Sequence, residues 1–360
     1  MLITRISGVN VLVGSEVQNE SSLTFVCSPG DIISSNSAPD TLVDGTGCTV
    51  MPGLIDCRFG SDATDDAPLE HTTYGLTTVI DSSTSCAKSQ AMRIVASDDP
   101  GLPSYIASGS AIGSDNDTLV SLFDRSAVQI VLTPDEAQTL VEAKIVSGQS
   151  DFIKIVVDQP GLEADIISRA VQETHRHGKL AIAYASQTKA YRVAVDLGFD
   201  HISPVPIDGE IEADVIDDIV RLGIGIIPAL SYLEKAMPLW KRNAPNDDFS
   251  FAVAAVRALD AAGARLCAGS SANHLNTVPL PFGKGLHDEM RLLAKVGLSN
   301  AKIIRAATSE PATLFGLLDR GVVGSGLRAD LILVEGNPLE DLEFLSKIRS
   351  VWIRGVPCTK

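Results

Sequence analysis

The sequence predicts an α/β fold in which a (β/α)8 TIM barrel carries a small β-sandwich formed by the N- and C-terminal segments. From about residue 51, strand-like runs alternate with amphipathic helical segments, most of which end at a glycine. About eight such units are typical of a closed parallel barrel. Both ends of the chain are instead rich in β-like runs. We therefore expect the sandwich at residues 1–50 and 322–360, and the barrel at residues 51–321.

The terminal segments have the pattern of short strands separated by turn residues. β-like runs at residues 6–13, 23–26, 31–33 and 41–43 alternate with clusters of Gly, Ser, Asn and Pro. Residues 50–57 form an apolar run with a Pro-Gly turn near its start and Asp56 near its end, which predicts one buried strand. Two further runs, at residues 329–334 and 351–356, return to β character. We expect the runs of both ends to pair in one small sheet.

The barrel segment begins after that buried run. We expect its helices at residues 134–146, 163–177, 188–197, 213–222, 252–262 and 286–296. The helix at 134–146 has Thr133 as its N-cap and a Pro-Asp-Glu first turn that suits the helix dipole. The expected strands are residues 77–80, 105–107, 152–157, 180–185, 201–202, 225–230 and 265–268.

The composition argues against several classes of protein. Of the 360 residues 45% are hydrophobic, and the net charge of -16 argues against a nucleic-acid partner, because phosphate contacts need clustered Lys and Arg. No apolar run approaches the ~20 residues that cross a bilayer, and the first residues lack a signal-peptide pattern. The cysteines lack CxxC spacing, which favours reduced thiols in the cytoplasm. They are Cys27, Cys48, Cys57, Cys86, Cys267 and Cys358.

Seven short motifs follow one another in a characteristic order. They are Met-Pro-Gly-Leu-Ile-Asp at 51–56, Gly-Leu-Thr-Thr-Val-Ile-Asp at 75–81, Phe-Ile-Lys-Ile at 152–155, His-Arg-His-Gly-Lys at 175–179, Ala-Ala-Thr-Ser-Glu-Pro-Ala at 306–312, Leu-Arg-Ala-Asp-Leu-Ile-Leu at 327–333 and Gly-Asn-Pro-Leu-Glu-Asp at 336–341. In this order the chain resembles the amidohydrolase superfamily, and most closely its imidazolonepropionase-like and Xaa-Pro-dipeptidase-like branch. The resemblance implies the same barrel and β-sandwich.

The resemblance also implies where such enzymes hold a catalytic metal. Strand 1 supplies His-x-His, strand 4 a carboxylated lysine, strands 5 and 6 one histidine each, and strand 8 an aspartate. At five of these six positions the ligand is replaced, and the substitutes are poor donors or none at all. We therefore expect a member without the metal centre and without a cofactor. The residues at the six positions are Arg58, Gly60, Lys154, Tyr184, Pro204 and Ser271.

The other histidines do not replace that set. His201 precedes Pro204 by three residues, so we expect it on the opposite face of its strand, toward the helices. His175 and His177 fall in the last turn of a helix, a favourable structural position for imidazole. We expect His71 before the second barrel strand and away from the barrel mouth.

Only His274 and His287 are expected on the C-terminal face of the barrel, where barrel chemistry occurs. His274 falls in the loop after strand 8, and His287 falls at the start of the next helix. Two histidines from one loop region do not make a catalytic zinc site.

Lys154 has two interpretations. Without two metal ions to bridge, a lysine carbamate has no support, so we expect a free amine near the barrel centre. Burial would lower the pKa of such an amine and make it a general base or a Schiff-base nucleophile. The alternative is an ammonium group paired with Asp158 or another acid.

Arg58 places a fixed cation at the mouth of strand 1. It could clamp a carboxylate or enolate oxygen, or donate to a developing oxyanion. The alternative is that it pairs with Asp62, Asp65, Asp66 or Asp81 and fills the emptied cavity.

The remaining candidates are polar or aromatic residues near the strand ends. A phenol at Tyr184 could transfer a proton or could fill the volume the metals left. The expected catalytic residues are Arg58, Lys154, Tyr184, Asp81, Asp158 and His274. The expected substrate-binding residues are Asp62, Ser271, Tyr232, Trp240 and His287.

Three functions fit these residues. The first is a metal-independent enzyme that acts on a small organic molecule by acid/base chemistry, such as isomerisation, cyclisation or elimination. The second is a metal-free hydrolase of an amide or cyclic amide C–N bond. The third is a non-catalytic homologue that serves as a binding protein or subunit. We expect a small-molecule partner and no nucleic-acid or membrane partner, and the sequence leaves a homo-oligomer open.

Overall fold

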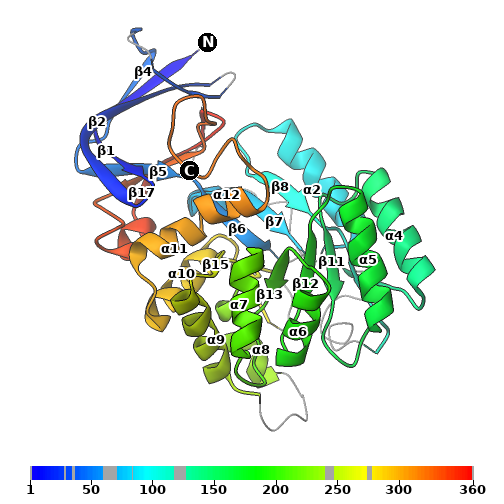
Figure 1. The fold of residues 1–360 in the computed structure, drawn as a ribbon. Helices are drawn as coiled ribbons and strands as arrows, with labels where there is room; N and C mark the ends of the chain where they lie inside the picture. The colour runs from blue at the N-terminus through cyan, green and yellow to red at the C-terminus, as the bar shows by residue number, and fades with distance from the viewer. Residues whose placement is uncertain are drawn as a thin grey trace.

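The protein has two parts, a sheet built from both chain ends and a barrel surrounded by helices (Figure 1). The computed structural model describes residues 2–27, 30–34, 37–59, 71–82, 84–116, 127–239, 247–273 and 278–358. None of the helices in these ranges is both long enough and apolar enough to cross a membrane.

The barrel is a ring of parallel strands. The third strand is interrupted after Ala107 and continues from Ala111, so β8 and β9 together occupy one position of the ring. Hydrogen bonds from Cys57 N to Ala268 O and from Ser271 N to Arg58 O close the ring between its last and first strands. The strands are β6 (Leu54–Phe59), β7 (Leu76–Asp81), β8 (Ser104–Ala107), β9 (Ala111–Gly113), β11 (Ile153–Val156), β12 (Ala181–Tyr184), β13 (His201–Ser203), β14 (Gly225–Ile226) and β15 (Arg265–Leu266), with β10 (Val128–Ile130) added beside β9.

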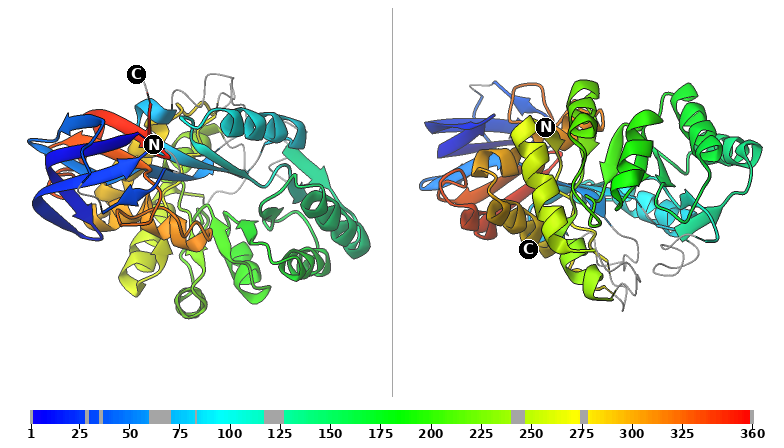
Figure 2. Two further views of the ribbon diagram at one scale, coloured as in Figure 1. Left: turned by 90° about the horizontal axis from the view of Figure 1, so that it is seen from above. Right: turned by 60° about the horizontal axis from the view of Figure 1, so that its bottom comes forward.

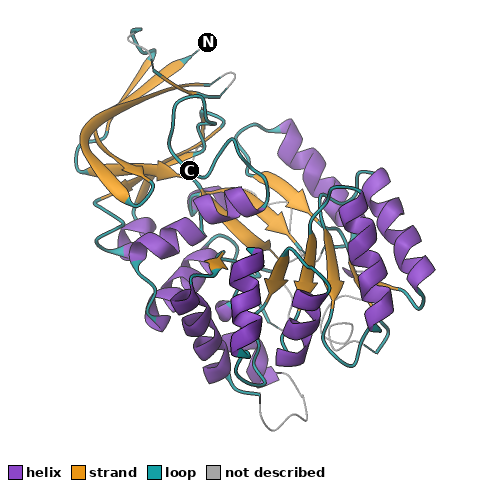
Figure 3. Cartoon of the chain, in the orientation of Figure 1, coloured by secondary structure: helices purple, strands orange, loops and turns teal. Residues whose placement is uncertain are grey.

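Helices cover the outside of this ring (Figure 3). The predicted N-cap is confirmed, because Thr133 Oγ1 accepts a hydrogen bond from Glu136 N. The helices are α2 (Cys86–Asp98), α4 (Pro134–Val146), α5 (Ala164–Arg176), α6 (Thr188–Asp196), α7 (Ala213–Leu222), α8 (Leu230–Ala236), α9 (Phe249–Ala262), α10 (Lys284–Val296), α11 (Asn300–Ala306) and α12 (Ser309–Leu314), with 3-10 turns η2 (Met237–Leu239) and η3 (Leu342–Ser346).

Two predicted strands differ from the structure. The run at 50–57 is split at Gly53 between β5 (Cys48–Pro52) in the terminal sheet and β6 in the barrel. A side chain at Gly53 would collide with Thr77, so the chain passes from one sheet to the other through a residue without Cβ. The run at 225–230 is a strand only over its first two residues, and Leu230 already begins α8. Apolar periodicity alone does not separate a short strand from a buried helix turn.

The terminal sheet joins both ends of the chain. Its strands lie in the order β18-β17-β16-β5-β1-β2-β3, and β4 pairs with β1. The two ends meet where β5 runs antiparallel to β16, and rings of Phe25 and Trp352 pack edge to face at 5.4 Å between centroids. The strands form one continuous curved sheet (Figure 2). Both ends therefore pair as expected, while a two-layered sandwich with boundaries at 50 and 322 stays a prediction.

The strands of this sheet complete the list of elements. They are β1 (Ile3–Val13), β2 (Glu16–Val26), β3 (Ile32–Ile33), β4 (Thr41–Asp44), β16 (Leu331–Glu335), β17 (Ile348–Ile353) and β18 (Val356–Pro357).

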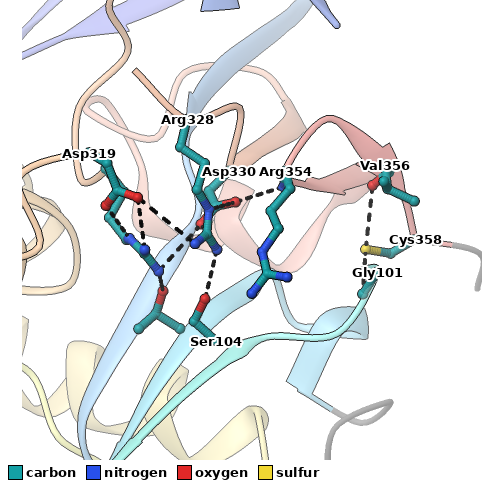
Figure 4. A network of polar contacts seen from close by, with 10 residues as sticks. Gly101, Ser104, Asp319, Arg328, Asp330, Arg354, Val356 and Cys358 are labelled. Carbon is teal, nitrogen blue, oxygen red and sulfur yellow. Dashed lines mark hydrogen bonds and ion pairs between the residues drawn. The ribbon is translucent and has the colours of Figure 1, made fainter. Parts of the chain in front are cut away.

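A polar network fastens the sheet to the barrel (Figure 4). Buried Asp330 pairs with Arg328 at 2.7 Å and accepts a hydrogen bond from Arg354 N. Arg328 also donates to Ser104 Oγ on β8 at 2.8 Å. The Arg328–Ser104 hydrogen bond crosses the junction, and Asp330 orients Arg328 for it.

The barrel interior is layered because side chains alternate along each strand. Phe152, Ile182 and His201 share the inward face with the residues two positions later in their strands. They lie toward the N-terminal end of the barrel, where α12 and the residue after it cover them: His201 Nε2 lies 3.2 Å from Leu314 O, and the Phe315 ring packs on His201 and Phe152. This end is closed by apolar packing.

The position of His201 differs from the prediction, whereas its contacts agree with the structural role predicted for it. It faces the barrel interior, not the helices, because Pro204 lies beyond the end of β13 and alternation cannot be counted from it. Its role is structural, as expected: the ring is buried, and burial lowers the pKa of the imidazole.

Candidate functional site

Arg58 lies at the centre of the C-terminal end of the barrel. Its side chain is 4% exposed, and Nη1 donates to Ser203 Oγ at the end of β13 over 2.8 Å. The guanidinium carbon lies 5.3 Å from the ring centroid of Tyr184 on β12 and 4.9 Å from that of Tyr232 on α8. In the described part of the chain no acidic side chain forms an ion pair with Arg58, so pairing with Asp81 is not observed. Two aromatic faces and one hydroxyl hold the cation.

Lys154 brings a second basic side chain to the same ring. It is 3% exposed on β11, and Nζ lies 5.4 Å from the Tyr184 centroid and 3.5 Å from Ser82 Oγ. Lys154, from the strand beside β12, and Arg58, from β6 elsewhere in the ring, therefore both approach Tyr184. The positive charge of the guanidinium favours an anion at this point of the barrel.

Ser271, the residue at the implied metal position of strand 8, lies next to Arg58. Ser271 has a positive φ of 54°, and its backbone N donates to Arg58 O. Its hydroxyl is buried and has no hydrogen-bond partner in the structure as described. Ser271 thus both fixes the backbone at Arg58 and leaves one donor available at the site.

A buried carboxylate lies directly behind Arg58. Asp56 accepts hydrogen bonds from Arg58 N, Ser270 N and Ser270 Oγ. Burial raises the pKa of Asp56 to about 6, although these hydrogen bonds oppose the shift. Asp56 therefore ties the first barrel strand to the loop after the last one.

The acids predicted to act in catalysis accept hydrogen bonds from nearby protein groups. Asp81 accepts hydrogen bonds from Tyr105 Oη at 2.6 Å and from the backbone and hydroxyl of Thr84. Asp158 accepts from Ser186 N and Ser186 Oγ. Both carboxylates lie at or just past strand ends, as expected; Asp81 organises the turn that follows it, and Asp158 ties the segment after β11 to the segment after β12.

Several predicted residues are not brought to this group. His287 is buried at α10, where Nε2 lies 2.8 Å from Tyr74 O, and burial lowers the pKa of its imidazole. The geometry therefore does not favour the predicted substrate-binding role of His287. Three further candidates, Asp62, Trp240 and His274, lie outside the described residues, as does Gly60.

The remaining histidines have structural contacts. His175 pairs with Asp200, and His177 contacts Glu173, as expected for a helix end. His71 packs edge-on against Phe59, the last residue of β6, and burial lowers the pKa of its imidazole to about 3. His71 therefore lies beside the mouth end of β6, not away from it.

Sequence reasoning missed the hydroxyls that orient the cations. Ser203 and Ser82 carry no motif, and only their positions at the ends of inward-facing strand patterns could have indicated them. Glu289 was also missed. It reaches from α10 to accept hydrogen bonds from Leu230 N and Ser231 N, which places α8 and hence Tyr232.

The residues at the implied metal positions do not fit a divalent ion. The guanidinium of Arg58 and the amine of Lys154 occupy the place where ligands would converge, and Pro204 offers no donor side chain. No cluster of three or more His, Cys, Asp or Glu side chains suited to a metal is found within the described ranges. A guanidinium repels a metal cation and has no acceptor atom.

The sequence model of the amidohydrolase family matches residues 69–358. This chain belongs to the amidohydrolase family. A curated relative, adenine deaminase 2 of Desulfotalea psychrophila, is 35% identical over 71 residues, which is 20% of this chain and 11% of that relative. The match thus spans about a tenth of the relative's length and carries no statement about its activity.

Solved structures share the fold over 99% of this chain. A Xaa-Pro dipeptidase with bound methionine has a TM-score of 0.82 at 20% identity and is covered over 99% of its length. Molinate hydrolase has a TM-score of 0.81 at 15% identity, with 94% covered. Ochratoxinase of A. niger has a TM-score of 0.80 at 16% identity, with 95% covered. At these identities the likeness establishes the TIM-barrel α/β fold.

Proposed function

We propose that this chain is a metal-independent member of the amidohydrolase family that binds the carboxylate of a small organic molecule at Arg58 and transforms it by acid/base chemistry. One observation carries the proposal: a buried guanidinium lies between two tyrosine rings without an acidic partner among the described residues. Burying an isolated charge costs several kcal/mol, and a desolvated cation–π contact returns roughly 2 kcal/mol. A bound carboxylate would complete the pairing.

The neighbouring groups indicate the kind of chemistry. Lys154 can exchange a proton if its amine is neutral, and the Tyr184 phenol can donate or accept one beside it. Isomerisation, cyclisation and elimination need such transfers and no activated water. Asp81 and Asp158 are assigned no proton transfer, because Asp81 holds the turn after β7 and Asp158 ties the segment after β11 to Ser186 after β12.

Two alternatives have specific support. Hydrolysis of a C–N bond is favoured by the family membership and by the fold shared with hydrolases such as the Xaa-Pro dipeptidase. A non-catalytic binding role is favoured by the engagement of both predicted acids in loop contacts. Cytoplasmic location and the absence of nucleic-acid and membrane partners stay predictions.

Ligand-induced stabilisation tests the proposal. The melting temperature of the wild type and of Arg58→Met is measured against a panel of hydroxy-, oxo- and N-acyl carboxylates. We expect some of these to stabilise the wild type by about 3 kcal/mol at a hundredfold excess over Kd, and the variant not at all. The best binder is then incubated with the protein and followed by proton NMR for rearrangement or hydrolysis.

Each outcome separates the hypotheses. A rearranged or eliminated product supports acid/base catalysis, a C–N cleavage product supports the hydrolase, and binding without turnover supports the non-catalytic role. Equal stabilisation of the wild type and Arg58→Met would remove Arg58 as the anchor. Stoichiometric zinc or manganese in protein purified without added metal would overturn metal independence.

A further inference from the structure

A cysteine and a buried lysine face each other at the gap between β8 and β9, apart from the Arg58 group. Cys86 is the first residue of α2, and Lys144 lies in the last turn of α4. Lys144 Nζ is 3.8 Å from Cys86 Sγ. The lysine side chain is 2% exposed, whereas the cysteine is half-buried and open to small solutes.

The lysine has no carboxylate partner in the described structure. Its amine donates to Ser110 O at 2.7 Å and reaches Gln129 Oε1 at 3.4 Å, and both of these acceptors are uncharged. The thiol of Cys86 is therefore the one group in contact with Lys144 that can become an anion. Burial lowers the pKa of Lys144, which favours a neutral, nucleophilic amine.

The surroundings of Cys86 favour its thiolate. Burial alone raises the pKa of the thiol, but the Lys144 charge and the hydrogen bonds with Ser110 outweigh it and bring the pKa below its ordinary value. The N-terminus of the 13-residue α2 adds its positive dipole end. The two activations therefore act in sequence: the ammonium of Lys144 stabilises the thiolate, and once the sulfur is no longer an anion, burial favours loss of the Lys144 proton.

Gly109 leaves the space that the pair needs. Its φ is +63°, and a Cβ there would lie 3.0 Å from Cys86 Sγ and 3.4 Å from Lys144 Nζ. The sulfur of Cys86 and the nitrogen of Lys144 therefore both lie beside the backbone of Gly109. No side chain separates them, and rotation of the lysine stem can bring them together.

We propose that Cys86 and Lys144 form a reversible sulfur–nitrogen bond when the protein meets hydrogen peroxide. The thiolate attacks one peroxide oxygen, the O–O bond breaks, and a sulfenic acid and, after protonation, water result. The neutral amine of Lys144 then attacks the sulfur, an S–N bond forms as the S–O bond breaks, and the hydroxyl leaves as a second water. Sulfur is oxidised and peroxide is reduced, and a thiol such as dithiothreitol reverses the bond.

Peptide mass spectrometry of the full chain tests this directly. Protein freed of reductant is treated with hydrogen peroxide and digested with trypsin without reduction. We expect the peptides of Cys86 and Lys144 to be joined, with a mass two hydrogen atoms below their sum and no cleavage at Lys144. Dithiothreitol should release both peptides unchanged. Failure to find the joined species while Cys86 is oxidised to sulfinic acid overturns the proposal.

The control variants separate the two steps. In Lys144→Arg the cation remains but cannot condense, so dimedone should trap a sulfenic acid on Cys86. In Cys86→Ser no joined peptide should form, and Lys144 should be cleaved normally. Half-buried Cys358 is an internal control, because burial raises its pKa to about 12 and it should stay a thiol. Equal oxidation of Cys358 and Cys86, or a joined peptide in Cys86→Ser, contradicts the assignment.

Discussion

The two ends of the barrel interior are built from the same strands and have opposite chemistry. At the N-terminal end, Phe152 and Ile182 pack with the Phe315 ring in a dry cluster. Two residues further along the same strands, Lys154 and Tyr184 take part in a cluster of buried polar and charged groups. A step of two residues along a strand is therefore enough to pass from apolar to polar surroundings inside the barrel.

The comparison separates stability from function. Apolar side chains at the closed end gain from burial and themselves need no hydrogen-bond partner. Buried cations at the open end cost free energy unless something compensates their charge. We therefore expect substitutions at the closed end to reduce stability, and replacement of the buried guanidinium at the open end to reduce ligand binding while stability is kept or raised.

The largest effect is expected at the closed end. Phe152→Ala should lower the free energy of unfolding by about 3–5 kcal/mol, because it leaves a cavity beneath the Phe315 ring. Urea unfolding measures this. Phe152→Leu, which keeps most of the volume, is the matched control and should cost about 1 kcal/mol. If Phe152→Ala is nearly neutral, the closed end is not the packed core described here.

A pH effect should come from the open end. Burial raises the pKa of Glu289 to about 7, although hydrogen bonds from Leu230 N and Ser231 N oppose the shift. The folded state then binds more protons than the unfolded state between pH 4.5 and about 7, so stability falls as pH rises through that window. The carboxylate contributes a loss of about 3 kcal/mol. Urea unfolding from pH 4.5 to 8 should show it, and Glu289→Gln should flatten the slope.

Arg58→Met should raise the free energy of unfolding, whereas Phe152→Ala should lower it. Since Arg58 forms no ion pair among the described residues, its removal breaks no salt bridge, although it takes away an attraction that lowers the pKa of Asp56. Replacing a buried ion by an apolar side chain of similar length is often stabilising by about 1–4 kcal/mol. Thermal unfolding without ligand checks this. A strongly destabilised variant would mean that the guanidinium is a structural group, and the contrast between the two ends would fail.

Much of this architecture could be predicted from the sequence. Alternating patterns and glycine ends predicted the barrel, and Thr133 predicted its helix start. The members of the site that lie on strands or next to them, such as Arg58 and Lys154, were found from motif positions. These signals are local, so they survive without knowledge of the fold.

The parts that could not be predicted depend on contacts distant in sequence. Residue 229 has a positive φ of 52°, and the helix start after it is held by Glu289, 59 residues from Leu230. Cys86 and Lys144 are 58 residues apart and meet because strand three is interrupted. A local sequence pattern does not predict such long-range contacts, since they depend on how the barrel closes.

The smallest effect, and the sharpest test of the open end, is expected at Ser203. Its hydroxyl accepts the hydrogen bond that orients the Arg58 guanidinium, and Ser203→Ala removes it while the two tyrosine rings remain. The free energy of unfolding should fall by about 1 kcal/mol. The Kd for the best carboxylate of the panel should rise by up to about tenfold, because the guanidinium keeps its charge but is no longer held in one orientation. Ser203→Thr keeps the hydroxyl and should bind as the wild type does. Unchanged binding in Ser203→Ala would mean that the aromatic rings alone position Arg58.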